Sequence, residues 1–140
     1  MQNRLLTVGL AMAAVVVSVA GCGAAQTVPR RAARLTIDGA THTSSPPACR
    51  QDQRYRTITI RDHDGGVEAV VLFSGYRAMP QWVKIRDVSG FTGSFWQGGV
   101  GDARVDVTND AFTITGRAYG INSANPNKVV NTDFKIVAEC

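Results

Sequence analysis

Apolar and polar residues alternate in short runs along most of the chain after residue 34. Leu35 and Ile37 begin this pattern, and Ile58 and Ile60 repeat it further along. Alternate residues of a β-strand point to opposite faces, so this period of two predicts strands rather than helices. Further strands are predicted at residues 67–73, 83–85, 91–96, 105–107, 112–114 and 134–138.

Turn residues separate these runs at short intervals. Asp64-Gly65-Gly66 lies between two predicted strands, and Asn109-Asp110 joins two others. Both sequences are typical of tight hairpin turns. The strand at 67–73 is apolar at nearly every position, which predicts burial on both faces. The pattern indicates an all-β fold of about eight or nine strands, either a single small antiparallel sandwich or a partly closed barrel.

The first 22 residues have the pattern of an exported lipoprotein. Arg4 precedes a run of apolar and small residues from 5 to 20, and the run ends in Val19-Ala20-Gly21-Cys22. This run is shorter than the roughly 20 apolar residues that a membrane-spanning helix needs. A cysteine directly after two small residues is where bacterial lipoproteins receive a diacylglyceryl group before cleavage. The sequence therefore predicts a signal peptide at 1–21 and lipidation of Cys22.

The segment after Cys22 is small, polar and basic. Residues 22–34 show no apolar period, which predicts a flexible tether before a globular domain at 35–140. Each buried methylene of an acyl chain contributes about 0.8 kcal/mol, so the lipid on Cys22 would anchor the protein to the outer side of the cell membrane. Arg30, Arg31 and Arg34 either contact anionic head groups or belong to a solvated linker.

The chain contains three cysteines, Cys22, Cys49 and Cys140. Lipidation consumes the first and leaves the other two as a pair in an oxidising compartment. No residues with metal-ligand spacing flank Cys49 or Cys140, and a cysteine at the last position is a poor support for catalysis. The sequence therefore predicts a structural disulfide between Cys49 and Cys140.

The charge pattern argues against one class of partner. The 15 basic and 11 acidic residues give a net charge of +4, and the basic residues are spread among the acids rather than gathered in a stripe. Proteins that bind nucleic acid usually show such a stripe, with aromatic residues beside it. We therefore expect no nucleic-acid partner.

Residues that could carry out chemistry are few. Asp62-His63-Asp64 could bind a divalent cation or act as a base, but it leads into two glycines, and Asp and Gly are both favoured in turns. His42 lies in a Ser/Pro-rich loop with no evident partner. Gly98, Gly99 and Gly101 precede strand-like residues rather than a helix that could hold phosphate. The sequence predicts no catalytic residue, no metal site, no cofactor and no enzymatic activity.

Aromatic residues offer a candidate binding surface. Phe91 and Phe95 are predicted in the core, whereas the two tryptophans alternate with apolar neighbours and can face outward. Exposed aromatic and arginine side chains contribute strongly to binding. The predicted surface site consists of Trp82, Trp96, Arg86 and Arg104.

The last part of the chain carries a specific order of motifs. It reads Phe112-Thr-Ile114-Thr-Gly116-Arg-Ala118-Tyr-Gly120, then Ala124-Asn125-Pro126, then Phe134-Lys-Ile136 and the closing Cys140. Leu35-Thr-Ile37-Asp38-Gly39 and Cys49 precede these motifs. Together with the lipidation sequence, this order resembles the mycobacterial 19 kDa lipoprotein antigen family over essentially the whole mature chain.

The resemblance implies an envelope lipoprotein with an acylated N-terminus, a β-rich domain, one disulfide and no enzymatic activity. It also implies recognition by host innate receptors that bind triacylated peptides. Tethers in this family are rich in Thr and Ser that carry sugars, whereas Thr27 is the one hydroxyl residue between Cys22 and Arg34. The chain departs from the family here, so a glycosylated tether does not follow from the resemblance.

Two functions are compatible with the sequence. In the first, which we expect, a tethered β domain binds proteins or glycoconjugates of the envelope or adheres to a surface, while the lipid serves as an immune ligand. In the alternative, the domain carries a lipid or a small apolar ligand within the cell envelope. Carriage requires an internal cavity, and large voids are costly in a domain of this size.

Overall fold

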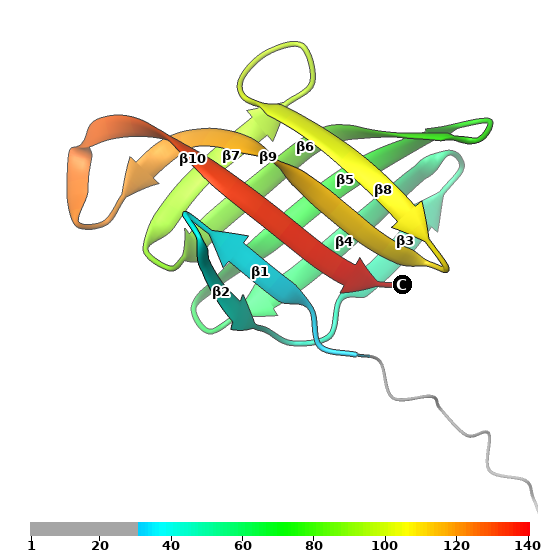
Figure 1. Ribbon diagram of the computed structural model, residues 1–140, viewed down its shortest axis with the longest axis horizontal. Helices are drawn as coiled ribbons and strands as arrows, with labels where there is room; N and C mark the ends of the chain where they lie inside the picture. The colour runs from blue at the N-terminus through cyan, green and yellow to red at the C-terminus, as the bar shows by residue number, and fades with distance from the viewer. Residues whose placement is uncertain (1–30) are drawn as a thin grey trace, which may run out of the picture.

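Residues 31–140 are described by the computed structural model, and they form ten antiparallel strands in one sheet (Figure 1). The strands are β1 (Arg34–Ile37), β2 (Ala40–Thr43), β3 (Ala48–Asp52), β4 (Tyr55–Asp62), β5 (Gly65–Ser74), β6 (Arg77–Val88), β7 (Phe91–Trp96), β8 (Asp102–Thr108), β9 (Ala111–Asn122) and β10 (Asn125–Glu139). The all-β prediction is confirmed, and every strand predicted from alternation is present.

The sheet curls over onto itself. Hydrogen bonding gives the strand order β2-β1-β10-β9-β7-β6-β5-β4-β3, and β8 pairs with β9 beside this path. Strand β9 links the two layers, since its first half pairs with β8 and its second half pairs with β7. In Figure 1, β1, β10, β9 and β8 cross in front of β4, β5 and β6. The result is an open, two-layered antiparallel sheet, in agreement with the predicted sandwich or partly closed barrel.

Side chains from both layers fill the space between them. Phe91 and Phe95 are buried, as predicted, and so is Phe112. The ring of Phe73 meets that of Phe112 edge to face, with the ring centroids 6.1 Å apart. Val, Ile and Ala residues at alternate positions of the strands supply most of the remaining core. Because the side chains alternate, the other residues of each strand point away from the core.

Two strands were not predicted. β2 overlaps the segment expected to be a Ser/Pro-rich loop, and β3 follows that segment. Asp38 and Gly39 have φ values of 49° and 78°, and this left-handed pair forms the tight turn between β1 and β2. Neither β2 nor β3 contributes a fully buried side chain, so the alternation of apolar residues that reveals a strand is missing from both.

Strand β5 is less buried than predicted. Val67, Ala69 and Val71 are buried, but Val70 and Leu72 on the opposite face are only half-buried. The expectation of burial on both faces was wrong, because the second layer covers only the face of β5 that carries Val67, Ala69 and Val71.

The amino-terminal part of the chain is described only from residue 31. The predicted signal peptide at 1–21, Cys22 and the tether up to residue 30 lie outside the described residues. Ala33 is completely buried, and its backbone bonds to Ser44 and Ser45. The folded domain therefore begins before residue 35, where it was predicted to start. Within residues 31–140, no helix is long and apolar enough to cross a membrane.

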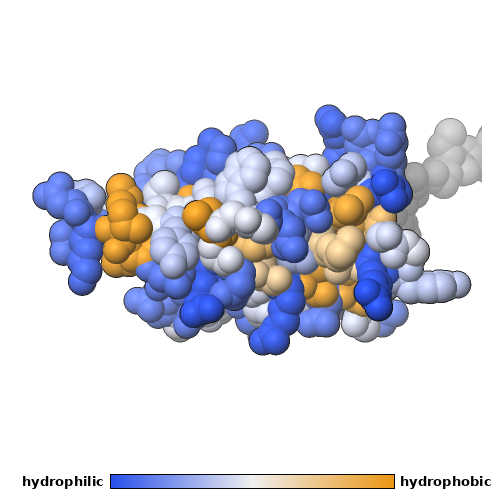
Figure 2. Space-filling model, turned by 90° about the horizontal axis from the view of Figure 1, so that it is seen from above, coloured by the Kyte–Doolittle hydropathy of each residue, from blue (hydrophilic) through white to orange (hydrophobic). Residues whose placement is uncertain are grey.

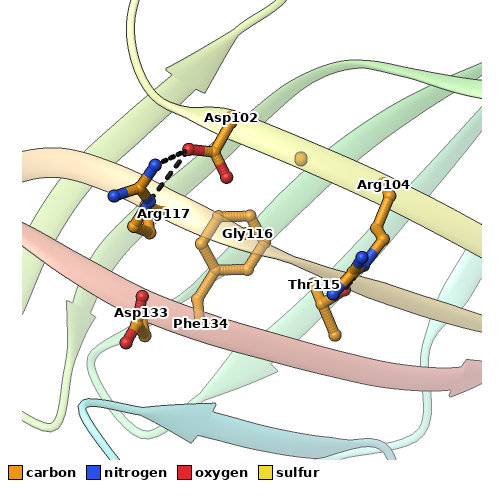
Figure 3. Close-up of a pocket in the computed structure, with 8 residues that line it drawn as sticks. Asp102, Arg104, Thr115, Gly116, Arg117, Asp133 and Phe134 are labelled. Carbon is orange, nitrogen blue, oxygen red and sulfur yellow. Dashed lines mark hydrogen bonds and ion pairs between the residues drawn. The ribbon is translucent and has the colours of Figure 1, made fainter.

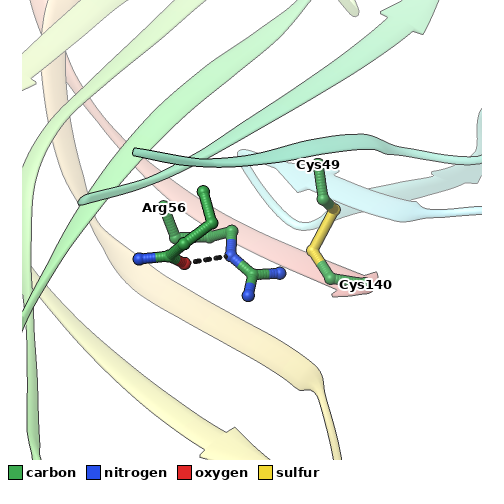
Figure 4. Close-up of a disulfide and its surroundings, with 4 residues drawn as sticks. Cys49, Arg56 and Cys140 are labelled. Atoms are coloured by element: carbon green, nitrogen blue, oxygen red, sulfur yellow. Dashed lines mark hydrogen bonds between the residues drawn. A yellow bond between two sulfur atoms is a disulfide. The ribbon is translucent and has the colours of Figure 1, made fainter. Parts of the chain in front are cut away.

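Cys49 and Cys140 form the predicted disulfide (Figure 4). It joins β3, at one edge of the sheet, to the residue that follows β10 in the opposite layer. Near the bridge, Arg56 donates a hydrogen bond from Nε to Gln51 Oε1 at 2.7 Å, and its guanidinium lies 5.6 Å from the centre of the Phe112 ring. The bridge therefore ties the two layers together covalently at this end of the core.

Replacement of both bridge cysteines by alanine should lower the free energy of unfolding by about 4 to 5 kcal/mol, because the bridge spans a sequence separation of 91 residues in the unfolded chain. Urea unfolding followed by circular dichroism measures this difference. Thiol labelling of the unreduced, unfolded protein should leave Cys49 and Cys140 unmodified. Labelling of both residues would contradict the bridge.

Candidate binding surface

The outer face of strands β3–β7 carries the candidate surface. Val83 and Ile85 in β6 and Phe95 in β7 point into the core. The residues between them therefore point outward. Trp82 and Trp96 lie directly opposite each other on β6 and β7, on this outer face.

The two tryptophans form a stacked pair. Their ring centroids are 6.2 Å apart, and the ring planes differ by 21°. Trp96 is 53% exposed and Trp82 is half-buried, so the pair presents an aromatic surface to solvent. The chain contains no other tryptophan. Both tryptophans thus lie at the surface, as predicted from the sequence.

Three rows of outward-facing residues cross these strands, and we define them together as the basic-aromatic face. The first row is Trp96, Trp82, Val70, Thr57 and Arg50; the second is Ser94, Lys84, Glu68, Thr59 and Ala48; the third is Arg86, Gly66 and Arg61. Neighbouring strands are about 4.8 Å apart, so the first row spans roughly 19 Å.

Positive charge dominates the basic-aromatic face. Its cations are Arg50, Arg61, Lys84 and Arg86, and its one carboxylate is that of Glu68. None of these side chains forms an ion pair within residues 31–140. A depression of about 340 Å³ lies on this face, and both Arg50 and Glu68 line it. The face therefore offers uncompensated cations beside an aromatic pair.

Gly66 leaves a gap between two arginines in the third row. Its φ is 156°, and a Cβ atom added there would lie 2.3 Å from the carbonyl oxygen of Ile60. A larger residue would push β4 and β5 apart, so the strands can pair here only through glycine. The guanidinium groups of Arg61 and Arg86 consequently have no side chain between them.

The structure places Arg104 away from the other predicted site residues. It lies on β8, donates a hydrogen bond from Nε to Thr115 Oγ1 at 3.3 Å, and lines a separate depression of about 520 Å³ over β8, β9 and β10 (Figure 3). The predicted site therefore divides between two surfaces. Trp82, Trp96 and Arg86 share the basic-aromatic face, and Arg104 does not belong to it.

An ion pair bounds the other end of the depression that Arg104 lines. Arg117 donates to Asp102 from both Nε and Nη2, and the Nε–Oδ2 distance is 2.9 Å (Figure 3). The hydrogen bond to Asp102 and the charge of its carboxylate raise the pKa of Arg117 above the ordinary value of a guanidinium. Both side chains are already paired, so this surface offers less free charge to a ligand than the basic-aromatic face.

The β9–β10 hairpin carries exposed aliphatic residues. Ile121 and Val129 pair across the hairpin and are 38% and 67% exposed. In Figure 2, an orange patch lies at the left end over this hairpin, and blue hydrophilic residues separate the other apolar patches from one another. Exposed aliphatic residues of this kind are common on protein surfaces. The hairpin is therefore a weaker candidate site than the basic-aromatic face.

His42 has partners that the sequence did not reveal. Its Nε2 atom lies 2.9 Å from Asp62 Oδ2, and its Nδ1 atom lies 3.4 Å from Ser89 Oγ. The Asp62 side chain is 9% exposed, and the pair joins the edge strand β2 to β4 across the opening of the sheet. The contact with Ser89 exceeds the about 2.6–3.2 Å typical of a nucleophile and its base, and none of these residues lines the two depressions described above. The geometry therefore favours a structural contact that joins β2 to β4, rather than a catalytic triad.

The residues of the Asp62-His63-Asp64 sequence have two different roles, because Asp62 contacts His42 and the other two residues form a turn. His63, with a φ of 42°, and Asp64 form the turn between β4 and β5, which confirms the turn interpretation for these two residues. For Asp62 that interpretation was wrong, because its carboxylate is buried and bound to His42. Within residues 31–140, no group of three or more His, Cys, Asp or Glu side chains is arranged to hold a metal ion.

Most cations of the basic-aromatic face were not predicted from the sequence. Lys84 could have been found, because it lies two residues from Trp82 and from Arg86 on the same strand and so shares their face. Arg50 and Arg61 lie on other strands, and their approach to Trp82 depends on the strand order. The alternation of apolar residues carries no information on that order.

Comparison with known proteins agrees with the resemblance seen in the sequence. The family described as Mycobacterium 19 kDa lipoprotein antigen matches residues 26–140. Probable lipoprotein LppE of Mycobacterium tuberculosis is 62% identical over 141 residues, which cover 100% of both chains. A putative lipoprotein of Mycobacterium indicus pranii is 33% identical over 144 residues, again 100% of both chains. Lipoprotein LpqH of Mycobacterium avium is 30% identical over 109 residues, which cover 76% of this chain and 67% of the relative.

Proposed function

Because this chain belongs to the Mycobacterium 19 kDa lipoprotein antigen family, we propose that it is anchored in the cell envelope by a lipid on Cys22 and acts by binding through its β domain. The observation that carries this proposal is the 62% identity, over the full chain, to a relative named as a probable lipoprotein. The signal pattern that ends at Cys22 supplies the anchor. No step of the proposed function requires catalysis.

The anchor and the domain have separate roles in this proposal. Arg31 pairs with Glu139 at 3.2 Å, so the chain enters the domain near its carboxyl end. Arg31 lies nine positions after Cys22, so the chain between them can span at most about 30 Å. The lipid thus keeps the domain near the membrane surface, and the acylated N-terminus is the part that host innate receptors would recognise. The β domain is left to contact other envelope components.

Packing supports binding at the surface over carriage of a ligand inside the domain. Phe91, Phe95 and Phe112 lie between the layers, and the buried core residues are at most 3% exposed. Protein interiors packed in this way lack space for an acyl chain. The basic-aromatic face, in contrast, offers exposed groups of the kinds enriched where proteins bind partners.

The mature protein should begin at an acylated Cys22, because the apolar run and the small residues before it direct lipidation and cleavage there. Intact-mass spectrometry of the membrane fraction tests this expectation. Cys22→Ser should remove the lipid and abolish membrane anchoring of the cleaved chain. A membrane form that retains residues 1–21 without lipid, or a Cys22→Ser protein that is anchored as before, would contradict the proposed anchor.

The double substitution Trp82→Ala and Trp96→Ala should weaken adhesion of the protein to isolated cell-envelope fragments without unfolding the domain. Trp96 alone should contribute less than about 1 kcal/mol to the free energy of unfolding, because surface substitutions are mostly small in effect. Phe95→Ala is the matched control on the same strand. Its side chain is buried, so it should destabilise the domain by about 3 to 5 kcal/mol. If the tryptophan substitutions unfold the domain, these residues are core residues and the surface assignment fails.

A further inference from the structure

The composition of the basic-aromatic face indicates the chemistry of its ligand. The Trp82–Trp96 pair presents flat aromatic rings, and more than half of Trp96 is exposed. Hydroxyl groups of Thr57, Thr59 and Ser94 lie in the same two rows and can donate and accept hydrogen bonds. A matching ligand has apolar faces that stack on aromatic rings and hydroxyl groups around their edges. Sugar rings combine both features.

Charge complementarity narrows the ligand class further. Arg50, Arg61, Lys84 and Arg86 are unpaired within the described residues, and Glu68 is the one acidic side chain in the three rows. Consecutive rows lie about 7 Å apart, because they are separated by two residues along each strand. A sugar ring stacked on the tryptophan row would thus place an acidic substituent near Lys84 in the second row. A further ring of the same chain would reach Arg61 and Arg86 in the third row, about 14 Å from the first.

We propose that the basic-aromatic face binds an acidic polysaccharide, a chain of sugar rings that carry carboxylate or phosphate groups. Trp82 and Trp96 stack against the rings, and the unpaired cations bind the acidic groups. The first row spans roughly 19 Å across five strands, which provides an extended track for a polymer. This inference rests on the binding function proposed above and names its ligand class.

An anionic membrane would also attract these cations, but the shape of the face favours a polymer. The basic-aromatic face lies on the outer side of a sheet that curls around its core, so it is convex across the strands. Its two ends at β3 and β7 turn away from any plane that touches its middle. A flexible polysaccharide can follow such a surface, whereas a flat bilayer contacts only part of it.

Binding can be measured on the full-length protein in uncharged detergent micelles. Both tryptophans of the chain lie on this face, so intrinsic fluorescence reports it directly. Polygalacturonate supplies carboxylates, phosphomannan supplies phosphates, and dextran is the uncharged control. We expect the emission of the tryptophans to change on titration with at least one acidic polymer and to stay constant with dextran. Which acidic polymer binds distinguishes the two kinds of acidic group.

Variants separate this site from general charge attraction. Trp96→Ala and the double substitution Arg61→Gln/Arg86→Gln should each weaken binding by roughly tenfold, measured by isothermal titration calorimetry. The matched control is Arg104→Gln/Lys135→Gln, which removes the same charge from exposed residues of the other layer. This control should bind as tightly as the unmodified protein.

Equal binding by all variants, or equal binding of dextran, would overturn the proposal. So would binding to phosphatidylglycerol vesicles through these residues without binding to either acidic polymer. If neither acidic polymer binds but the double tryptophan variant still adheres less to envelope fragments, the ligand class is wrong and the binding function stands. If the tryptophans matter in neither experiment, both proposals fail.

Discussion

The apolar side chains of the strands must reach one core, and this requirement sets the shape of the sheet. The strands that supply the core bury side chains on one face only, so a flat sheet would leave Phe91, Phe95 and Phe112 exposed to water. The sheet curls instead, so that its two layers enclose these side chains. The His42–Asp62 contact joins the edge strand β2 to β4, and the Cys49–Cys140 bridge joins the edge strand β3 to the end of β10. Both contacts hold the layers together.

The same constraint leaves the outer face of the sheet free for another role. Side chains on this face contribute little to the core, so Trp96 and the neighbouring cations can be used for binding at small cost in stability. The basic-aromatic face depends on how the strands pair, because the register of β3 to β7 brings Arg50, Trp82 and Trp96 into one row. In the proposed function, stability and ligand recognition are therefore carried by opposite faces of the same strands.

The sequence was sufficient for the strands that bury apolar residues and for the disulfide. Alternation revealed all strands except β2 and β3, which lack a fully buried side chain. The predicted lipidation of Cys22 left only one pairing for Cys49 and Cys140. The partners of His42 could not be predicted, because Asp62 and Ser89 lie 20 and 47 residues away. Arg50 and Arg61 could not be predicted for the same reason, since only the strand order places them on the same face as the tryptophans.

Hydroxyl-radical footprinting of the full-length protein, with and without an acidic polysaccharide that binds it, tests most directly whether the outer face of β3–β7 is the binding face. We predict that the polymer protects Trp82 and Trp96 from oxidation. We also predict that Tyr76, in the turn between β5 and β6, and Val107, exposed on β8 in the other layer, remain as reactive as in the free protein. Protection of Val107 on β8 with no change at the tryptophans would contradict this assignment and place the binding site on the other layer.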